Sequence, residues 1–203
     1  MALATTDIHG APDVRMVMLR SFTPTGFVFF TDRKSAKGNQ LRTNPQAVLW
    51  GYWRELGHQV RGSGTVSETT PEEDDSAFGE RPRDAKLAIA AWQQGSAIGD
   101  TEKLHDTVRA LEQRLLDGVI KRPSRWGGYR LLPNRFVFWE ERPGHIHWSQ
   151  AYHHAEHEQN DNSNDSDFRF RLSFLNNRSL CKMFTRYSGR DMGATRRDTK
   201  SHV

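Results

Sequence analysis

The chain has 203 residues, of which 35% are hydrophobic and 27% charged, with a formal net charge of +4 and one cysteine. This length allows a buried core of ordinary size, the single cysteine excludes an intrachain disulfide, and no run of about 18 apolar residues could span a membrane. The first residues lack the pattern of a signal peptide, so we expect a cytoplasmic protein. Because much of the positive excess follows Arg169, the charge argues for a small anionic ligand rather than nucleic acid.

The first part of the chain predicts a β meander followed by a short helix. Strands are expected over residues 2–6, 14–22 and 27–31, because apolar and β-branched runs alternate with turn sequences. A helix is expected over 35–43, and it ends before Pro45 because the residue that precedes a proline is pushed out of the α region.

The middle of the chain predicts two more strands and then helices. A short helix should begin at Pro71, where the following acidic residues complement the positive end of the helix dipole. A longer helix carries an apolar stripe on one face. The further elements are strands over 47–53 and 58–67, helices over 84–92 and 100–116, and strands near 128–132, 135–139 and 145–150.

Strands that do not alternate regularly with helices predict a mostly β fold with helical additions, in the form of a mainly antiparallel barrel or curled sheet. The composition changes after Tyr152 to "HHAEHEQNDNSNDSD", which is too polar to bury the surface that ordering requires. We therefore expect a folded domain over residues 1–152 and a largely disordered tail over 153–203.

Cations and hydroxyls gather where the predicted strands end. Arg15 and Arg20 flank "RMVMLR", Thr31 closes the next strand, and Ser35 and Lys37 lie in the turn before a helix. Arginine forks, hydroxyls, lysine and helix N-terminal amides are typical of phosphate sites. The alternative is a solvated edge that binds nothing. A flat strand also sends residues five apart to opposite faces, so Arg15 and Arg20 share a cavity only through a bulge or a ligand that wraps the strand.

Eight blocks of sequence resemble a known family in their order and spacing. They are "RMVMLR", "GFVFFTDRKSAKGNQL", "NPQAVLWGYW", "HQVRGSGTV", "ERPRDAKL", "QQGSAI", "WGGYRLLPNRFVFW" and "HIH". From about Ala2 to His147 the chain resembles the pyridoxine/pyridoxamine 5'-phosphate oxidases, flavoenzymes of the FMN-binding split-barrel fold. The resemblance implies bound FMN and a homodimer, because family members bind the flavin between two subunits.

The resemblance also implies a role for each matching position. The residues expected to bind the substrate are Arg20, Arg81 and His147, and Arg20 and His147 are also the expected catalytic residues. No metal is expected. The residues expected to contact FMN are Arg15, Met16, Val17, Met18, Leu19, Arg20, Phe30, Thr31, Lys37, Gln59, Gln94, Gly95 and Trp139.

The departures from the family pattern gather on the substrate side. Ala77 stands where the family has a tyrosine, Ala85 where it has a serine, and His145 and Ser149 where it has arginines. Ala36 also replaces an arginine that many members have next to the phosphate lysine. Each lost charge-assisted hydrogen bond is worth roughly 1.5–3 kcal/mol, so several losses would weaken substrate binding by orders of magnitude.

The resemblance implies oxidation of pyridoxamine or pyridoxine 5'-phosphate to pyridoxal 5'-phosphate, with dioxygen as acceptor and hydrogen peroxide as product. The altered substrate side leaves two alternatives open. One is a related FMN enzyme that acts on another substrate, such as a phenazine precursor. The other is a degenerate copy that folds without catalysing a reaction.

Two further patterns are weaker. The histidines around His147 and in the polar segment beyond it could bind a metal, but a solvated tail with one active-site histidine is the favoured interpretation. The tryptophans other than Trp139 are expected to be core or interface residues. They are Trp50, Trp53, Trp92, Trp126 and Trp148.

Overall fold

The computed structural model describes residues 1–23, 25–95, 101–116, 118–144 and 146–153. These residues belong to the first of two units of the chain, Met1–His154. The tail predicted to be disordered covers residues 153–203, and all of it after His153 lies outside the described part. No helix of the described part is long and apolar enough to cross a membrane.

The described strands form one sheet in which every pairing is antiparallel. The expectation of a mainly antiparallel, mostly β fold with added helices is confirmed. The strands are β1 (Ala2–Thr6), β2 (Pro12–Met16), β3 (Ser21–Thr23), β4 (Gly26–Asp32), β5 (Gln46–Trp53), β6 (His58–Glu68), β7 (Trp126–Arg142) and β8 (Ile146–His153). The helices are α1 (Ala36–Thr43), the 3-10 turn η1 (Arg54–Leu56), α2 (Pro71–Gly79), α3 (Arg83–Ala91) and α4 (Thr101–Leu115).

The order of the strands requires the sheet to curl. The order is β2-β1-β5-β6-β7-β4-β3, so β2 and β3 stand at opposite ends of this path although only residues 17–20 separate them in the chain. A flat sheet of seven strands would hold its edges about 29 Å apart. The five peptide units from Met16 to Ser21 reach at most about 18 Å. The two edges must therefore approach each other, as in a barrel.

The prediction of one strand over 14–22 is wrong, because the backbone changes partner in its middle. Val17 donates its N–H to the carbonyl of Met1 at 2.8 Å, whereas Arg20 donates to the carbonyl of Val28 in β4 at 2.9 Å. Residues 17–20 thus pass from one edge of the sheet to the other. The strand that holds Arg15 ends before Arg20, so strand alternation no longer decides whether the two arginines face one cavity.

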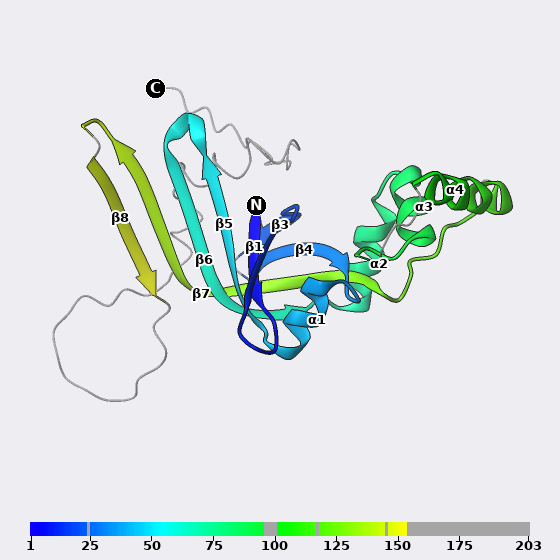
Figure 1. Cartoon of the computed structure of the whole chain (residues 1–203), viewed down its shortest axis with the longest axis horizontal. Coiled ribbons are helices and arrows are strands. Elements are labelled where there is room, and N and C mark those ends of the chain that lie inside the picture. The colour runs from blue at the N-terminus through cyan, green and yellow to red at the C-terminus, as the bar shows by residue number, and fades with distance from the viewer. Residues whose placement is uncertain (24, 96–100, 117, 145, 154–203) are drawn as a thin grey trace, which may run out of the picture. The chain divides into compact units, whose positions relative to one another are not determined.

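The long strand β7 replaces two predicted strands. Its first half pairs with β4 and its second half with β8, while β6 runs along both halves (Figure 1). Pro133, which falls between the two predicted strands, lies opposite Gly64 where the β6 register shifts. A bulge tolerates proline because no ladder hydrogen bond from that nitrogen is needed. A Cβ on Gly64 would lie 2.1 Å from the Leu132 carbonyl oxygen, so the close approach needs glycine.

Alternation along the strands builds the core. β5 buries every second residue, and the side chains of Leu3, Phe29, Leu49 and Leu131 are fully buried inside the curled sheet. A second apolar cluster consists of Phe78, Leu87, Ile120 and Trp126. The predicted stripe of the long helix packs against it through Val108, Leu111 and Leu115. The helices α2, α3 and α4 therefore bury their apolar faces against one another and against the start of β7.

A capping box fixes the start of α2. The Thr70 hydroxyl accepts from the N–H of Glu73 at 3.2 Å, and the Glu73 carboxylate accepts from the N–H of Thr70 at 3.0 Å. Pro71 occupies the first turn, where its missing N–H has no cost. The start predicted at Pro71 is confirmed.

A buried carboxylate anchors the same helix to the sheet. Asp74 is fully buried, and it accepts hydrogen bonds from the Thr69 hydroxyl at 2.5 Å and from the N–H of Gly128 at 2.8 Å. Its other oxygen lies 3.0 Å from Arg33 and 3.6 Å from Arg122. A buried charge needs such partners. The network holds α2 against the first residues of β7.

Candidate functional site

A buried lysine lies at the end of β4. The Lys37 side chain leaves α1 and places its ammonium 3.0 Å from the Thr31 hydroxyl and 3.3 Å from the Ser35 hydroxyl. Lys37 is only 7% exposed, and Thr31 and Ser35 are buried as well. Burial of the ammonium lowers the pKa of Lys37, and the nearby Arg15 acts in the same direction. An anion at this place would relieve both effects.

The segment after α3 comes to the same place. The Thr31 hydroxyl donates to the Gln94 side-chain carbonyl at 2.9 Å. Gly95 has a positive φ of 87°, which favours glycine, and a Cβ there would lie 3.7 Å from Ser35. Four residues predicted to bind FMN, Thr31, Lys37, Gln94 and Gly95, therefore converge from three separate segments. We call these four, together with Ser35, the Lys37 cluster.

Arg15 lies near the Lys37 cluster, but protein acceptors hold its guanidinium. It donates to the Thr5 hydroxyl at 2.5 Å and to the Gln40 side chain at 2.8 Å, and it pairs with Asp13. Asp13 also accepts from Gln40 at 3.3 Å, and these hydrogen bonds, with the charge of Arg15, hold the pKa of Asp13 below its ordinary value. A phosphate that binds Arg15 must therefore compete with the Asp13 carboxylate.

The residues of the Lys37 cluster fit a phosphate group. The nearest other carboxylate, Asp32, is engaged by Arg125 at 2.9 Å and accepts from the backbone N–H of Lys34 at 2.8 Å. Among the described residues the Lys37 ammonium has only neutral hydroxyls as hydrogen-bond partners, and Asp32 and Asp13 offset its burial only in part, so the pKa of Lys37 stays lowered. Hydroxyls and an ammonium together are the donors that phosphate oxygens accept from. The chemistry of these donors therefore fits a phosphate group, as the expected FMN contacts require.

A second cationic place lies beyond the end of α2. Arg81 is partly buried, and its Nε has no hydrogen-bond partner among the described residues. Burial lowers the pKa of Arg81, and the charge of Arg20 lowers it further. In the described part of the chain neither arginine forms an ion pair. Arg20 is exposed, so the partly buried Arg81, with which no carboxylate of the described residues pairs, is the cation of the two that an anionic ligand would stabilise more.

The other predicted FMN residues lie elsewhere in the chain. Gln59 stands between Tyr52 and Trp139 in the sheet, and its side-chain carbonyl accepts from the Trp50 indole at 2.7 Å. The Trp139 and His147 rings are 4.9 Å apart. We call Gln59, Trp139 and His147 the Trp139 group.

The two groups are separated along β7. Thr31 pairs with Gly127, whereas Gln59 pairs with Trp139, which lies twelve residues further along that strand (139 − 127). One chain therefore brings the Lys37 cluster together with Arg15 and assembles the Trp139 group separately.

The remaining predicted positions are exposed or partly buried. Met16 and Met18 are 74% and 69% exposed, while Phe30 stacks on Trp126 with ring centroids 5.0 Å apart. Among the substituted positions, Ala77 packs against the second apolar cluster and Ser149 is exposed opposite Trp139. Ala85 is partly buried in α3, and His145 lies outside the described residues.

Sequence reasoning missed three contributors to these places. Asp13 and Gln40 give no local signal, because they meet Arg15 only through the packing of α1 on β1 and β2. Trp126 was expected in the core, and it is 4% exposed. What the sequence could not reveal is that the Arg81 guanidinium lies over its ring, with Cζ 4.8 Å from the ring centroid.

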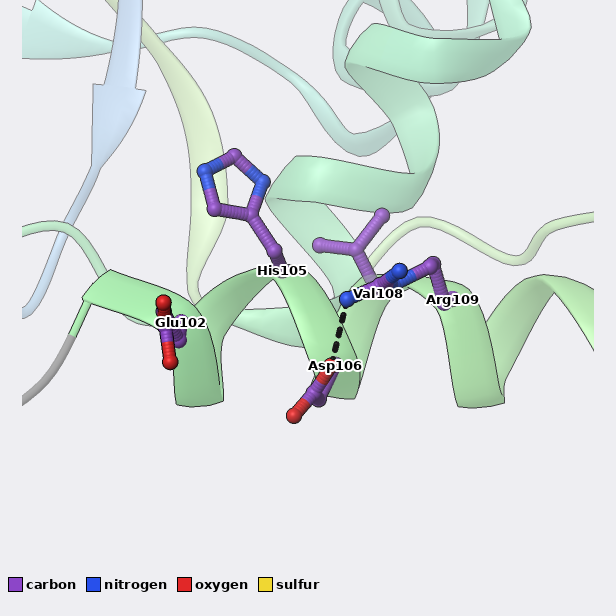
Figure 2. Close-up of a pocket in the computed structure, with 5 residues that line it drawn as sticks. All are labelled: Glu102, His105, Asp106, Val108 and Arg109. Carbon is purple, nitrogen blue, oxygen red and sulfur yellow. Dashed lines mark hydrogen bonds and ion pairs between the residues drawn. The ribbon is translucent and has the colours of Figure 1, made fainter.

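A hollow on α4 is separate from these groups. Figure 2 shows the side chains of α4 that line it, and Asp106 and Arg109 form an ion pair there at 2.6 Å. Both side chains are about two-thirds exposed, and pairs of this kind contribute little to stability. Its described lining residues are Glu102, His105, Asp106, Val108 and Arg109. None of them is a predicted site residue. In the described residues no three histidine, cysteine or acidic side chains gather as a metal site.

Known proteins of one family are similar to most of this chain. A family profile described as "Pyridoxamine 5'-phosphate oxidase" matches residues 1–115. The pyridoxine/pyridoxamine 5'-phosphate oxidase of Anaeromyxobacter dehalogenans is 42% identical over 151 residues, which cover 74% of this chain and 76% of that protein. The protein of the same name from Pseudomonas fluorescens SBW25 is 43% identical over 147 residues, 72% of this chain and 68% of that protein.

Two solved structures are similar as well. PhzG from Burkholderia lata, in complex with tetrahydrophenazine-1-carboxylic acid, matches with a TM-score of 0.73 and 29% identity over 77% of both chains. A pyridoxamine 5'-phosphate oxidase-related, FMN-binding protein from Nostoc punctiforme matches with a TM-score of 0.62 and 20% identity, over 78% of this chain and 82% of that one. The second likeness supports the fold.

Proposed function

Because the chain belongs to the pyridoxamine 5'-phosphate oxidase family, we propose that it is an FMN-dependent oxidase of pyridoxamine and pyridoxine 5'-phosphate. The product is pyridoxal 5'-phosphate, and dioxygen is reduced to hydrogen peroxide. With the amine substrate, water is consumed and ammonia is released. The observation that carries the substrate assignment is the partly buried, unpaired Nε of Arg81 beside a second cation, Arg20.

The Lys37 cluster is the proposed phosphate site for FMN. When bound, FMN supplies the two-electron acceptor and the route to dioxygen. The chain's own part is to bind and orient. Lys37 donates from a buried position, the Thr31 and Ser35 hydroxyls supply neutral donors, and Arg15 adds a fork once Asp13 is displaced. Fixed donors in a water-poor site bind more strongly than mobile ones.

Arg20 and Arg81 are the proposed phosphate ligands of the substrate. A phosphate dianion would satisfy the open Nε of Arg81 and remove the repulsion between the two guanidinium groups. Anchoring the phosphate restricts how the substrate ring approaches the flavin, which leaves orientation as the main contribution of the chain. His147, whose ring lies 4.9 Å from the Trp139 ring, is the third residue that we propose to lie near the substrate.

We further propose that the enzyme is a homodimer in which each flavin contacts both copies. Two observations support this. The Lys37 cluster and the Trp139 group lie apart in one chain, so a second copy offers a way to join them. Apolar side chains are also exposed on neighbouring strands of one sheet face, where Met16 and Trp50 both stand opposite Ala2. A patch of this kind marks an interface.

The dimer proposal has a direct test. Sedimentation velocity should give one species with twice the chain mass, and Met16→Glu, which places a charge on the exposed patch, should shift it toward the monomer. FMN affinity should fall in the same variant, because the dimer is lost. A monomeric wild-type protein that binds FMN at full affinity would refute the proposal.

The activity has a test with separate outcomes for cofactor and substrate. The purified protein is titrated with FMN and followed by flavin fluorescence, and peroxide is then measured with pyridoxamine 5'-phosphate. We expect saturable flavin binding and peroxide release. Arg81→Ala should raise KM at least tenfold, because a charged hydrogen bond of about 1.5–3 kcal/mol is lost. Arg109→Ala on the exposed side of α4 is the matched control.

A second candidate is oxidation of a carboxylate-bearing ring compound. It is favoured by the likeness to PhzG, whose structure is described in complex with tetrahydrophenazine-1-carboxylic acid. Binding of FMN without turnover of pyridoxamine 5'-phosphate, combined with turnover of such a carboxylate, would select this candidate. Absence of flavin binding at excess FMN would instead indicate a copy that does not catalyse the reaction.

A further inference from the structure

The indole of Trp126 contacts Arg81 and also Phe30, which is a predicted flavin neighbour. It is 4% exposed at the start of β7. Phe30, a predicted flavin neighbour, stacks on it at 5.0 Å with an interplanar angle of 10°. Phe78, at the end of α2, meets the indole edge at 5.4 Å and 64°. Trp126 therefore touches residues of the cofactor side and of the helix that leads to Arg81.

Arg81 rests on the same ring. Its Cζ lies 4.8 Å from the ring centroid, and its Nε has no hydrogen-bond partner in the described part of the chain. The backbone N–H of Arg81 donates to the Phe78 carbonyl at 3.1 Å. Without a carboxylate to fix it, the partly buried guanidinium depends on the indole for its orientation. A cation over a tryptophan face is held more strongly when water is excluded.

Trp126 is itself firmly placed. The backbone N–H of Trp126 donates to the Pro123 carbonyl at 2.9 Å, and the backbone carbonyl of Trp126 accepts from the Arg122 guanidinium at 2.8 Å. Arg122 in turn pairs with Asp75 of α2 at 2.6 Å. Arg122 thus ties α2, the helix that precedes Arg81, to the strand that carries the indole.

We propose that Trp126 is a positioning residue, whose indole aims the Arg81 guanidinium toward Arg20 so that the two cations form one phosphate site. This inference rests on the proposed function, since it assigns the residue that orders its substrate site. Trp126 acts through Arg81 and does not itself contact the substrate. Loss of the aromatic face leaves Arg81 charged but free to turn, and the phosphate then binds to a less ordered site.

The test compares two ligands that differ by the phosphate. Binding of pyridoxal 5'-phosphate and of pyridoxal to the FMN-loaded protein is measured by absorbance titration, together with inorganic phosphate as a competitor. Trp126→Leu removes the ring and keeps an apolar side chain. We expect it to weaken pyridoxal 5'-phosphate binding about 3- to 30-fold, with pyridoxal unchanged. Trp126→Phe keeps a ring of weaker attraction and should restore most of the affinity.

Two measurements separate positioning from general damage. FMN affinity and the melting temperature of each variant show whether the fold and the cofactor site are intact. Arg81→Ala is then combined with Trp126→Phe, which also decides the matter if Trp126→Leu does not fold. If Trp126 acts through Arg81, the phenylalanine variant has no further effect once Arg81 is absent.

The outcomes distinguish this inference from the proposed function. Equal losses for both ligands, or an effect of Trp126→Phe that persists without Arg81, overturn the positioning role. So does a phosphate preference that survives in Trp126→Leu. If the wild-type protein binds FMN but binds pyridoxal 5'-phosphate and pyridoxal with equal affinity, the substrate assignment is refuted instead.

Discussion

Replacement of Lys37 by methionine separates binding of the flavin phosphate from stability of the apoprotein. Methionine keeps an unbranched side chain of similar length and removes the ammonium. Lys37 is 7% exposed, and among the described residues its ammonium has only the Thr31 and Ser35 hydroxyls as hydrogen-bond partners. The apoprotein therefore buries a charge that it compensates poorly, and it binds the phosphate through that same charge.

The structure sets the size of each effect. A hydrogen bond from a buried ammonium to a phosphate oxygen is worth about 1.5–3 kcal/mol, so FMN affinity should fall about 10- to 150-fold in Lys37→Met. The apoprotein should melt at the same temperature or slightly higher, because a desolvated charge is removed. The increase in melting temperature on adding FMN should shrink accordingly.

The assay is a fluorescence titration with FMN and with riboflavin, which lacks the phosphate. The affinity for FMN should differ between the wild type and Lys37→Met, whereas the affinity for riboflavin should be the same in both. Lys34→Met is the matched control, because Lys34 belongs to the same turn and is exposed. The reasoning would be refuted if riboflavin affinity fell as much as FMN affinity, or if Lys34→Met had the same effect as Lys37→Met.

Three further outcomes follow from the same geometry. Asp13→Asn should raise FMN affinity about two- to fivefold at low salt, because the carboxylate competes for Arg15 in a partly exposed pair; unchanged affinity in the titration would exclude that competition. As pH rises through the lowered pKa of Lys37, below its ordinary 10.5, FMN affinity should fall while the apoprotein gains stability, since the unfolded chain then binds more protons; binding and melting series over pH 7 to 10 check both signs. Thr70→Ala should destabilise the fold by about 1 kcal/mol through loss of the cap on α2; urea unfolding with an unmoved midpoint would contradict this.

Local features of the fold were predictable from the sequence. The apolar and aromatic run over 47–53 predicted the strand β5, and the acidic turn after Pro71 predicted the start of α2. Both depend on neighbours within a few residues, so local strand composition and capping chemistry suffice. The order and spacing of the eight sequence blocks also led to the family, which the comparisons confirm.

The candidate site was only partly predictable. The resemblance named Lys37, Thr31 and Gln94, and the fold brings them within hydrogen-bond distance. It also named Gln59 and Trp139, yet in one chain Trp139 lies twelve residues beyond Gly127, the partner of Thr31, along β7 (139 − 127), and Gln59 pairs with Trp139 from β6. The roles of these residues stay predictions until ligand binding is measured.

What the sequence by itself determined is which segments favour strands, where helices begin, and which side chains carry charge. Tertiary structure alone decided that the chain breaks its strand at residues 17–20, that Asp13 holds Arg15, and that Arg81 rests on Trp126. The physical reason is range. Backbone and solvent preferences act over a few residues, whereas the partner of a side chain depends on how distant strands close into one curled sheet.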